Sequence, residues 1–208
     1  TALVPNGTIN PAAVLEGHAA CESSIARHGP GNGNQPLLMG VQMSPANIFT
    51  MQLVLGYIAW LLCFRAYIWP RLKSMDRIEA QRAIATLHSF RFFGLVFVVP
   101  GVVGPHLPGA FATFAAYGDL ATGLLAILAL LAVRAGPLYW LFVVAFNVVG
   151  IGDLSLDYYH AVRANLPAVA GELGATYAIP IIYVPLLMIT HIAALYMLVR
   201  PPARRASA

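Results

Sequence analysis

Apolar residues form long continuous runs between residues 49 and 199, and short polar segments separate them. A helix that crosses a membrane needs about 20 predominantly apolar residues. Five runs come close to that length or exceed it, and they cover residues 49–69, 87–105, 111–134, 137–160 and 177–199. The pattern therefore predicts an all-α protein, a polytopic membrane bundle of five transmembrane helices.

Polar segments flank the predicted transmembrane domain on both sides. Residues 1–48 contain several Gly, Pro and Asn residues and lack the basic stretch and apolar core of a signal peptide. We therefore expect a mostly irregular tail. Met43 is a candidate native start because it shortly precedes the first apolar run, and the residues before it would then be vector-derived or an upstream extension. Residues 200–208 form a short basic tail.

Basic residues are distributed unevenly over the connections between the apolar runs. The first connection is the most basic and contains Arg71, Lys73, Arg77 and Arg82, whereas residues 104–110 contain no Lys or Arg. Cytoplasmic loops of membrane proteins carry the excess of basic residues. The distribution predicts an N-terminus outside the membrane and a C-terminus in the cytoplasm.

The composition indicates that lipid is the solvent of this chain. Hydrophobic residues make up 59% of the sequence and charged residues only 10%, whereas soluble domains carry about 25% charged residues. The net charge of +4 comes from basic residues at the ends of the apolar runs, and no basic, aromatic-rich groove for nucleic acid is visible. We therefore expect a lipid bilayer, and no nucleic acid, as a partner. The Ala-, Gly- and Arg-rich composition points to a bacterial protein of the plasma (inner) membrane.

Ionisable residues within the apolar runs are the candidate functional groups, because a charge inside a membrane is costly. Asp119 and Asp153 lie in the third and fourth runs, each about two turns from the outer end. Neither has a basic partner at the same predicted depth. Asp157 and His160 extend the polar stripe of the fourth run, since positions i, i+4 and i+7 share one helix face. Asn147 lies off that stripe and is not included.

Basic and imidazole side chains occupy the predicted inner half of the bundle. Arg91 lies near the start of the second run, with His88 one turn before it, and His191 lies well inside the fifth run. If these two helices touch, Arg91 or His88 would approach His191. The predicted ligand- or proton-binding residues are therefore Asp119, Asp153, Asp157, His160, Arg91 and His191.

Each of these residues also has a purely structural interpretation. Asp119 and Asp153 could be protonated, bind a cation, or accept hydrogen bonds between helices. Asp157 and His160 could belong to an interfacial belt with the neighbouring tyrosines. Arg91 would then be an anchor that reaches the lipid headgroups, and His191 a satisfied core histidine.

Metal, cofactor and enzyme signatures are weak in this sequence. Asp153, Asp157 and His160 are candidate metal ligands because they share one helix face. No cofactor is identified, and the histidines do not supply the pair at equal depth that a b-type haem needs. The sequence contains no GxSxG, HExxH or glycine-rich phosphate loop. The absence of a catalytic motif argues against an enzyme without excluding one.

Small residues and prolines interrupt the predicted spans. Gly118, Gly123, Gly150 and Gly152 lie in the third and fourth runs, where small residues let helices approach closely. Such faces also suit a homo-oligomer or a partner in a membrane complex. Prolines remove an internal N–H and should kink the second and fifth helices, and they occur at Pro100, Pro180 and Pro185.

Three functions remain open at this point. The first is a small carrier or binding protein for a cation, a proton or a small polar solute, which would use the intramembrane aspartates. The second is a non-catalytic subunit or scaffold of a larger membrane complex. The third is an integral-membrane enzyme that acts on a lipid or a quinone, with a metal on the fourth helix.

Overall fold

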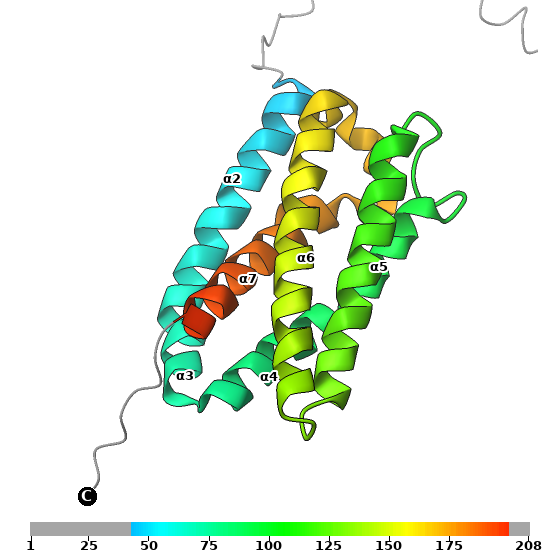
Figure 1. Cartoon of the computed structure of the whole chain (residues 1–208). Coiled ribbons are helices and arrows are strands. Elements are labelled where there is room, and N and C mark those ends of the chain that lie inside the picture. The colour runs from blue at the N-terminus through cyan, green and yellow to red at the C-terminus, as the bar shows by residue number, and fades with distance from the viewer. Residues whose placement is uncertain (1–42, 200–208) are drawn as a thin grey trace, which may run out of the picture. The chain divides into compact units, whose positions relative to one another are not determined.

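The structure, a computed structural model, describes residues 43–199. Predictions about the segment before Met43 and about the basic C-terminal tail fall outside the described residues. Every secondary-structure element in the described part is helical, as predicted, and the helices are arranged as a bundle (Figure 1). We call its two ends the η3 end and the α3 end, after the segments that lie there.

The elements follow one another in a simple order. The regular helices are α2 (Pro45–Cys63), α3 (Trp69–Ser74), α4 (Arg77–His88), α5 (Gly109–Leu131), α6 (Pro137–Arg163) and α7 (Val184–Val199). The tighter 3₁₀ segments are η2 (Ser89–Val98) and η3 (Leu166–Thr176), and the wider π segments are η1 (Phe64–Ile68) and η4 (Ile179–Tyr183).

Side-chain caps define two of the helix starts. Ser44 Oγ accepts a hydrogen bond from the Asn47 N–H at 3.2 Å and caps α2. Asp76 Oδ1 accepts from the Ile78 and Glu79 N–H groups at 2.9 Å and caps α4. Both residues are of the type that satisfies the free N–H groups of a first helical turn. The cap at Asp76 has a consequence for the site, because it starts α4 well before residue 87.

Four helical stretches are long and apolar enough to cross a membrane, by length and composition. They are Pro45–Ser74, Gly109–Leu131, Pro137–Arg163 and Ile179–Val199. Many large apolar side chains on these stretches are exposed, which is compatible with lipid contact. The described chain is therefore compatible with a membrane helical bundle.

The second of the five predicted spans, residues 87–105, is not confirmed as a spanning helix. It falls on the end of α4, on η2 and on the turns that follow. Pro100 ends the helical stretch, because a residue before proline is disfavoured in the helical region and Val99 is extended with ψ 121°. The expected proline kink inside this span is therefore wrong, since the proline follows the helix.

Pro180 and Pro185 lie where the fifth run departs from regular α-helix. Pro180 lies inside η4 and Pro185 near the start of α7. A wider turn leaves main-chain carbonyls without their usual partners, and the Ile182 carbonyl accepts a hydrogen bond from Trp60 Nε1 on α2 at 2.8 Å. Gly56 permits this packing, because a Cβ there would overlap the Ile181 carbonyl. The structure therefore has a π segment at Pro180 where the sequence predicts a kink, and a donor from α2 compensates for one carbonyl of that segment.

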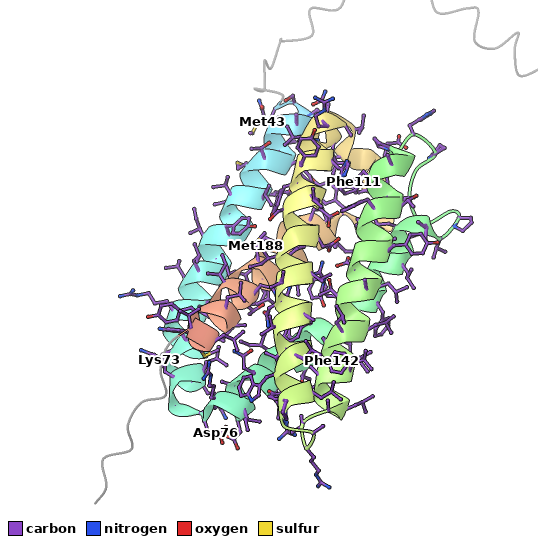
Figure 2. All side chains as sticks on the ribbon, in the orientation of Figure 1. Met43, Lys73, Asp76, Phe111, Phe142 and Met188 are labelled. Carbon is purple, nitrogen blue, oxygen red and sulfur yellow. The ribbon has the colours of Figure 1, made fainter. Side chains whose placement is uncertain are left out.

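The core consists of two apolar clusters, one toward each end of the bundle. The cluster toward the η3 end includes Phe49, Phe97, Phe111, Leu166 and Leu173. The cluster toward the α3 end includes Leu72, Ile84, Tyr139, Val143 and Phe146. Figure 2 shows Phe111 near the η3 end, and Lys73 and Asp76 at the α3 end. Helix α5 packs against η2 and α6 along much of its length. Most of the buried polar residues lie on these three elements, on α7 and at the end of α4.

Candidate functional site

Arg91 on η2 forms the centre of a buried polar cluster. Its side chain is fully buried. Its Nε atom donates to Asp119 Oδ1 at 2.6 Å, and its Nη2 atom forms an ion pair with the same oxygen at 2.5 Å. Nη2 also donates to Asp153 Oδ2. Asp119 and Asp153 come from α5 and α6, so one guanidinium joins three elements. We call these three residues the Arg91 cluster.

This arrangement corrects two expectations from the sequence. Asp119 and Asp153 do have a basic partner at their depth, and Arg91 is not an anchor that reaches lipid headgroups. The predicted depth of Arg91 is wrong because α4 begins at Arg77, not at the start of the apolar run. By residue 91 the chain is already well inside the bundle.

Glycines provide the room for the Arg91 cluster and its neighbours. A Cβ at Gly118 would overlap Asp153 Oδ1, and a Cβ at Gly94 would overlap the Asp119 carboxylate. A Cβ at Gly150 would likewise overlap the ring of His191. The small residues of the third and fourth runs therefore admit polar side chains into the interface as well as bringing helices together.

His191 on α7 extends the polar contacts beyond the Arg91 cluster. Its Nε2 atom lies 3.3 Å from Arg91 Nη1, and a guanidinium can only donate. Nε2 therefore accepts, which leaves the proton of the neutral ring on Nδ1. Nδ1 donates to Asn147 Oδ1 at 2.9 Å. Both ring nitrogens are thus satisfied, as expected for a core histidine, and the predicted approach of Arg91 to His191 is confirmed.

His88 lies beside His191, with ring centroids 3.8 Å apart. Thr190 Oγ1 donates to a main-chain carbonyl of its own helix, so its contact with His88 Nε2 at 3.0 Å is one in which the imidazole N–H donates. His88 Nδ1 is then an acceptor, and it has no hydrogen-bond partner among the described residues. A row of polar groups therefore runs from His88 through His191 to the Arg91 cluster.

A cavity of about 100 Å³ adjoins the Arg91 cluster on the side of the η3 end. Asp119 and Asp157 line it together with mostly apolar side chains. Asp157 Oδ1 is buried and has no hydrogen-bond partner within the described chain. Asp157 lies one helical turn after Asp153 on α6 and shares the cavity with Asp119, so it belongs to the same charged group.

The sequence from residue 48 to residue 199 matches the family described as Domain of unknown function (DUF8737). The chain belongs to this family. Comparison with curated proteins and with solved structures gives no match. All residues of the Arg91 cluster, His191 and Asp157 lie inside the stretch that the DUF8737 match covers.

His160 does not join the other predicted site residues of this DUF8737 chain. Its ring contacts Phe114 and Tyr159, at centroid distances of 4.8 and 5.5 Å. Within residues 43–199, no group of three His, Cys, Asp or Glu side chains is placed to hold a metal ion. Asp153, Asp157 and His160 are therefore not gathered as a metal site.

The orientation of α6 explains why Asn147, and not His160, lies on the buried face of this helix. The predicted stripe was centred on Asp153 and His160, but the buried face of α6 is centred nearer Val143 and Gly150. This face includes Asn147, which is fully buried, and leaves His160 at its edge. The sequence spacing could have placed Asn147 on this buried face, because residues three apart on a helix, such as Asn147 and Gly150, lie on the same side.

The Arg91 cluster and Asp157 together contain more negative than positive groups. The group contains the carboxyl groups of Asp119, Asp153 and Asp157 against the guanidinium of Arg91. Arg91 is the only buried Lys or Arg in the described part of the chain. Uncompensated charge is costly inside a protein of low polarity. With all side chains ionised, the group would therefore need further positive charge.

Proposed function

We propose that this protein is a small membrane carrier or binding protein that takes up a proton or a small cation at Asp157 and the Arg91 cluster. The observation that carries the proposal is the excess of carboxyl groups over cations in a buried site. A bound proton or cation would neutralise that excess. Ionisable groups inside membrane bundles are commonly used in this way, in ion pathways and proton relays.

Asp157 is the group that would exchange the proton or cation. Asp119 and Asp153 are held by Arg91 through short contacts, whereas Asp157 Oδ1 has no partner among the described residues and borders the cavity. Asp153 Oδ1 also lacks a partner in that part of the chain. Buried carboxylate oxygens without hydrogen-bond partners destabilise a fold. A purely structural role as a scaffold does not explain why they are present. These atoms favour binding over a purely structural role.

The proposed membrane topology retains five crossings. The α4–η2 stretch would form the second crossing, because it leads from the α3 end toward the η3 end between α3 and α5 (Figure 1). Lys73 lies at the α3 end (Figure 2), and Arg71 lies on the same short helix. The rule that basic loops remain in the cytoplasm then assigns the α3 end and the C-terminus to the cytoplasm. The proposed location is a bacterial plasma membrane.

Flux into liposomes tests the proposed function. The full chain is reconstituted, an inward proton gradient or Na⁺ gradient is imposed, and the internal ion is followed with a trapped indicator dye. We expect uptake above that of protein-free vesicles. Asp157→Asn should lower the uptake rate at least tenfold, because an amide neither takes up a proton in this pH range nor carries the negative charge that neutralises a cation.

Glu79→Gln is the matched control for that experiment. Glu79 is an exposed residue of α4, outside the cavity lining, and its loss removes a carboxylate elsewhere on the molecule. This variant should retain the wild-type uptake rate. Equal uptake by the wild-type protein and Asp157→Asn, or no uptake above empty vesicles, would refute the proposal.

A further inference from the structure

The cavity beside the Arg91 cluster has walls of two kinds. Its inner side carries the carboxyl groups of Asp119 and Asp157. The remaining lining is apolar apart from Tyr158, and it includes the rings of Phe49, Phe97 and Phe111, which are all buried. Such walls favour a hydrocarbon, and the carboxylates favour a cation. A ligand that fits both kinds of wall would contain a hydrocarbon portion and a cationic group.

Helices α2 and α6 both contribute to the lining of the cavity. Leu53 of α2 and Val162 of α6 both line it, and Val162 is 76% exposed. The main packing partners of α2 are η3, η4 and α7, not α6. Next to the cavity, α2 and α6 are joined by the hydroxyl groups of Tyr57 and Tyr158, which are 2.7 Å apart. Among the lining residues only Val162 is exposed, so we expect the cavity to open beside it, between α2 and α6 and toward the proposed lipid phase.

The volume limits how much of a ligand the cavity can enclose. An engineered apolar cavity of about 150 Å³ holds a benzene molecule, so a cavity of about 100 Å³ holds a smaller group. An ammonium head with the first few carbons of a chain is of that size. The rest of a longer chain would leave through the opening between α2 and α6.

We propose that the cavity binds a single-chain cationic amphiphile, with its ammonium group at Asp157 and Asp119 and its alkyl chain directed outward between α2 and α6. The aromatic rings that line the cavity would add to the attraction, because a cation is favoured near an aromatic face. The inference rests on the proposed function, since it uses the same carboxyl groups. An anionic head is disfavoured by these carboxylates, and a neutral hydroxyl head gains only a hydrogen bond, which is weaker than a charge-assisted one.

Ligand-induced stabilisation of the full chain in nanodiscs provides the test. Thermal unfolding is followed by tryptophan fluorescence while octylamine, octanol or octanoate is added at equal concentrations in the membrane. We expect octylamine to raise Tm in a saturable manner, with half-saturation at least tenfold below that of octanol. Octanoate should give no saturable shift. The three probes share one chain length, so their differences report the head group.

Two variants assign the binding to the cavity. Asp157→Asn should weaken the effect of octylamine at least tenfold and leave that of octanol unchanged, whereas Glu79→Gln should behave as the wild-type protein. If Asp157→Asn does not fold, Ala161→Leu replaces it, because Ala161 lines the cavity without carrying charge. The larger side chain should fill the space and abolish saturable stabilisation.

The outcomes separate this inference from the proposed function. Equal effects of octylamine and octanol, or undiminished octylamine binding in Asp157→Asn and Ala161→Leu, would overturn the amphiphile site. If ion uptake still depends on Asp157 in that case, the proposed function stands. Saturable octylamine binding without any ion uptake would support the site and refute the carrier.

Discussion

Gly118→Ala should destabilise the protein through the Arg91 cluster. Gly118 lies on α5, and a Cβ at this position would overlap Asp153 Oδ1. Asp153 would have to move away from α5, although its other oxygen is bound to Arg91. The substitution therefore strains a buried ion pair instead of an ordinary apolar contact.

The magnitude follows from three opposing contributions. Alanine gains about 1 kcal/mol over glycine in helix propensity. Overpacking in a well-filled interior costs about 1–3 kcal/mol, and loss of one partner from a buried charge pair costs about 3–5 kcal/mol. Because Asp153 would be displaced without being removed, only part of the last cost applies. We expect a net loss of about 2–4 kcal/mol in the free energy of unfolding.

Gly152→Ala is the matched control for this prediction. Gly152 lies on α6, and a Cβ there would meet nothing within 4 Å. Its replacement should be neutral or stabilise by up to about 1 kcal/mol. Both variants are unfolded reversibly in mixed micelles with increasing denaturing detergent, and the free energies of unfolding are compared. Equal stability of the two variants would refute the assignment of Gly118 to the space beside Asp153.

Three further substitutions test contacts elsewhere in the bundle. Trp60→Phe removes the indole donor to η4 and should lower the free energy of unfolding by about 0.5–1.5 kcal/mol, measured by thermal unfolding. An unchanged Tm would argue against compensation by α2. Asn147→Ala leaves the His191 Nδ1–H unpaired and should lower the free energy of unfolding by about 1–3 kcal/mol in the same measurement. No loss of stability would contradict the assignment of the proton to Nδ1. Glu172→Ala removes the acceptor of the His106 N–H, so this amide should exchange its hydrogen faster in mass spectrometry, and unchanged exchange would show that the contact does not hold the loop.

Helices α5 and α6 could be predicted closely from the sequence. The apolar runs predict helices over residues 111–134 and 137–160, and the structure has Gly109–Leu131 and Pro137–Arg163. Long apolar runs separated by a short connection specify two neighbouring antiparallel helices. The approach of Asp119 to Asp153 follows from the same pattern, because each lies about two turns from the same end.

The position of Arg91 could not be predicted in this way. Its depth depends on the cap at Asp76 and on the change from α4 to η2 at Ser89. Hydrophobic periodicity reports neither feature, since α4 is too polar to belong to an apolar run. A 3₁₀ helix also rises about 2.0 Å per residue instead of about 1.5 Å. Both effects move Arg91 away from the end of the bundle, toward the acids.

A double-mutant cycle on Arg91 and Asp153 tests most directly whether the buried acids converge on this guanidinium. The free energy of unfolding is measured for the wild-type protein, Arg91→Gln, Asp153→Asn and the double variant under the same conditions. Direct contact predicts that Arg91→Gln costs about 3–5 kcal/mol in the wild-type background and about 2–3 kcal/mol less in the Asp153→Asn background. Losses that add within about 0.5 kcal/mol would mean that the two side chains do not interact, and would contradict the account.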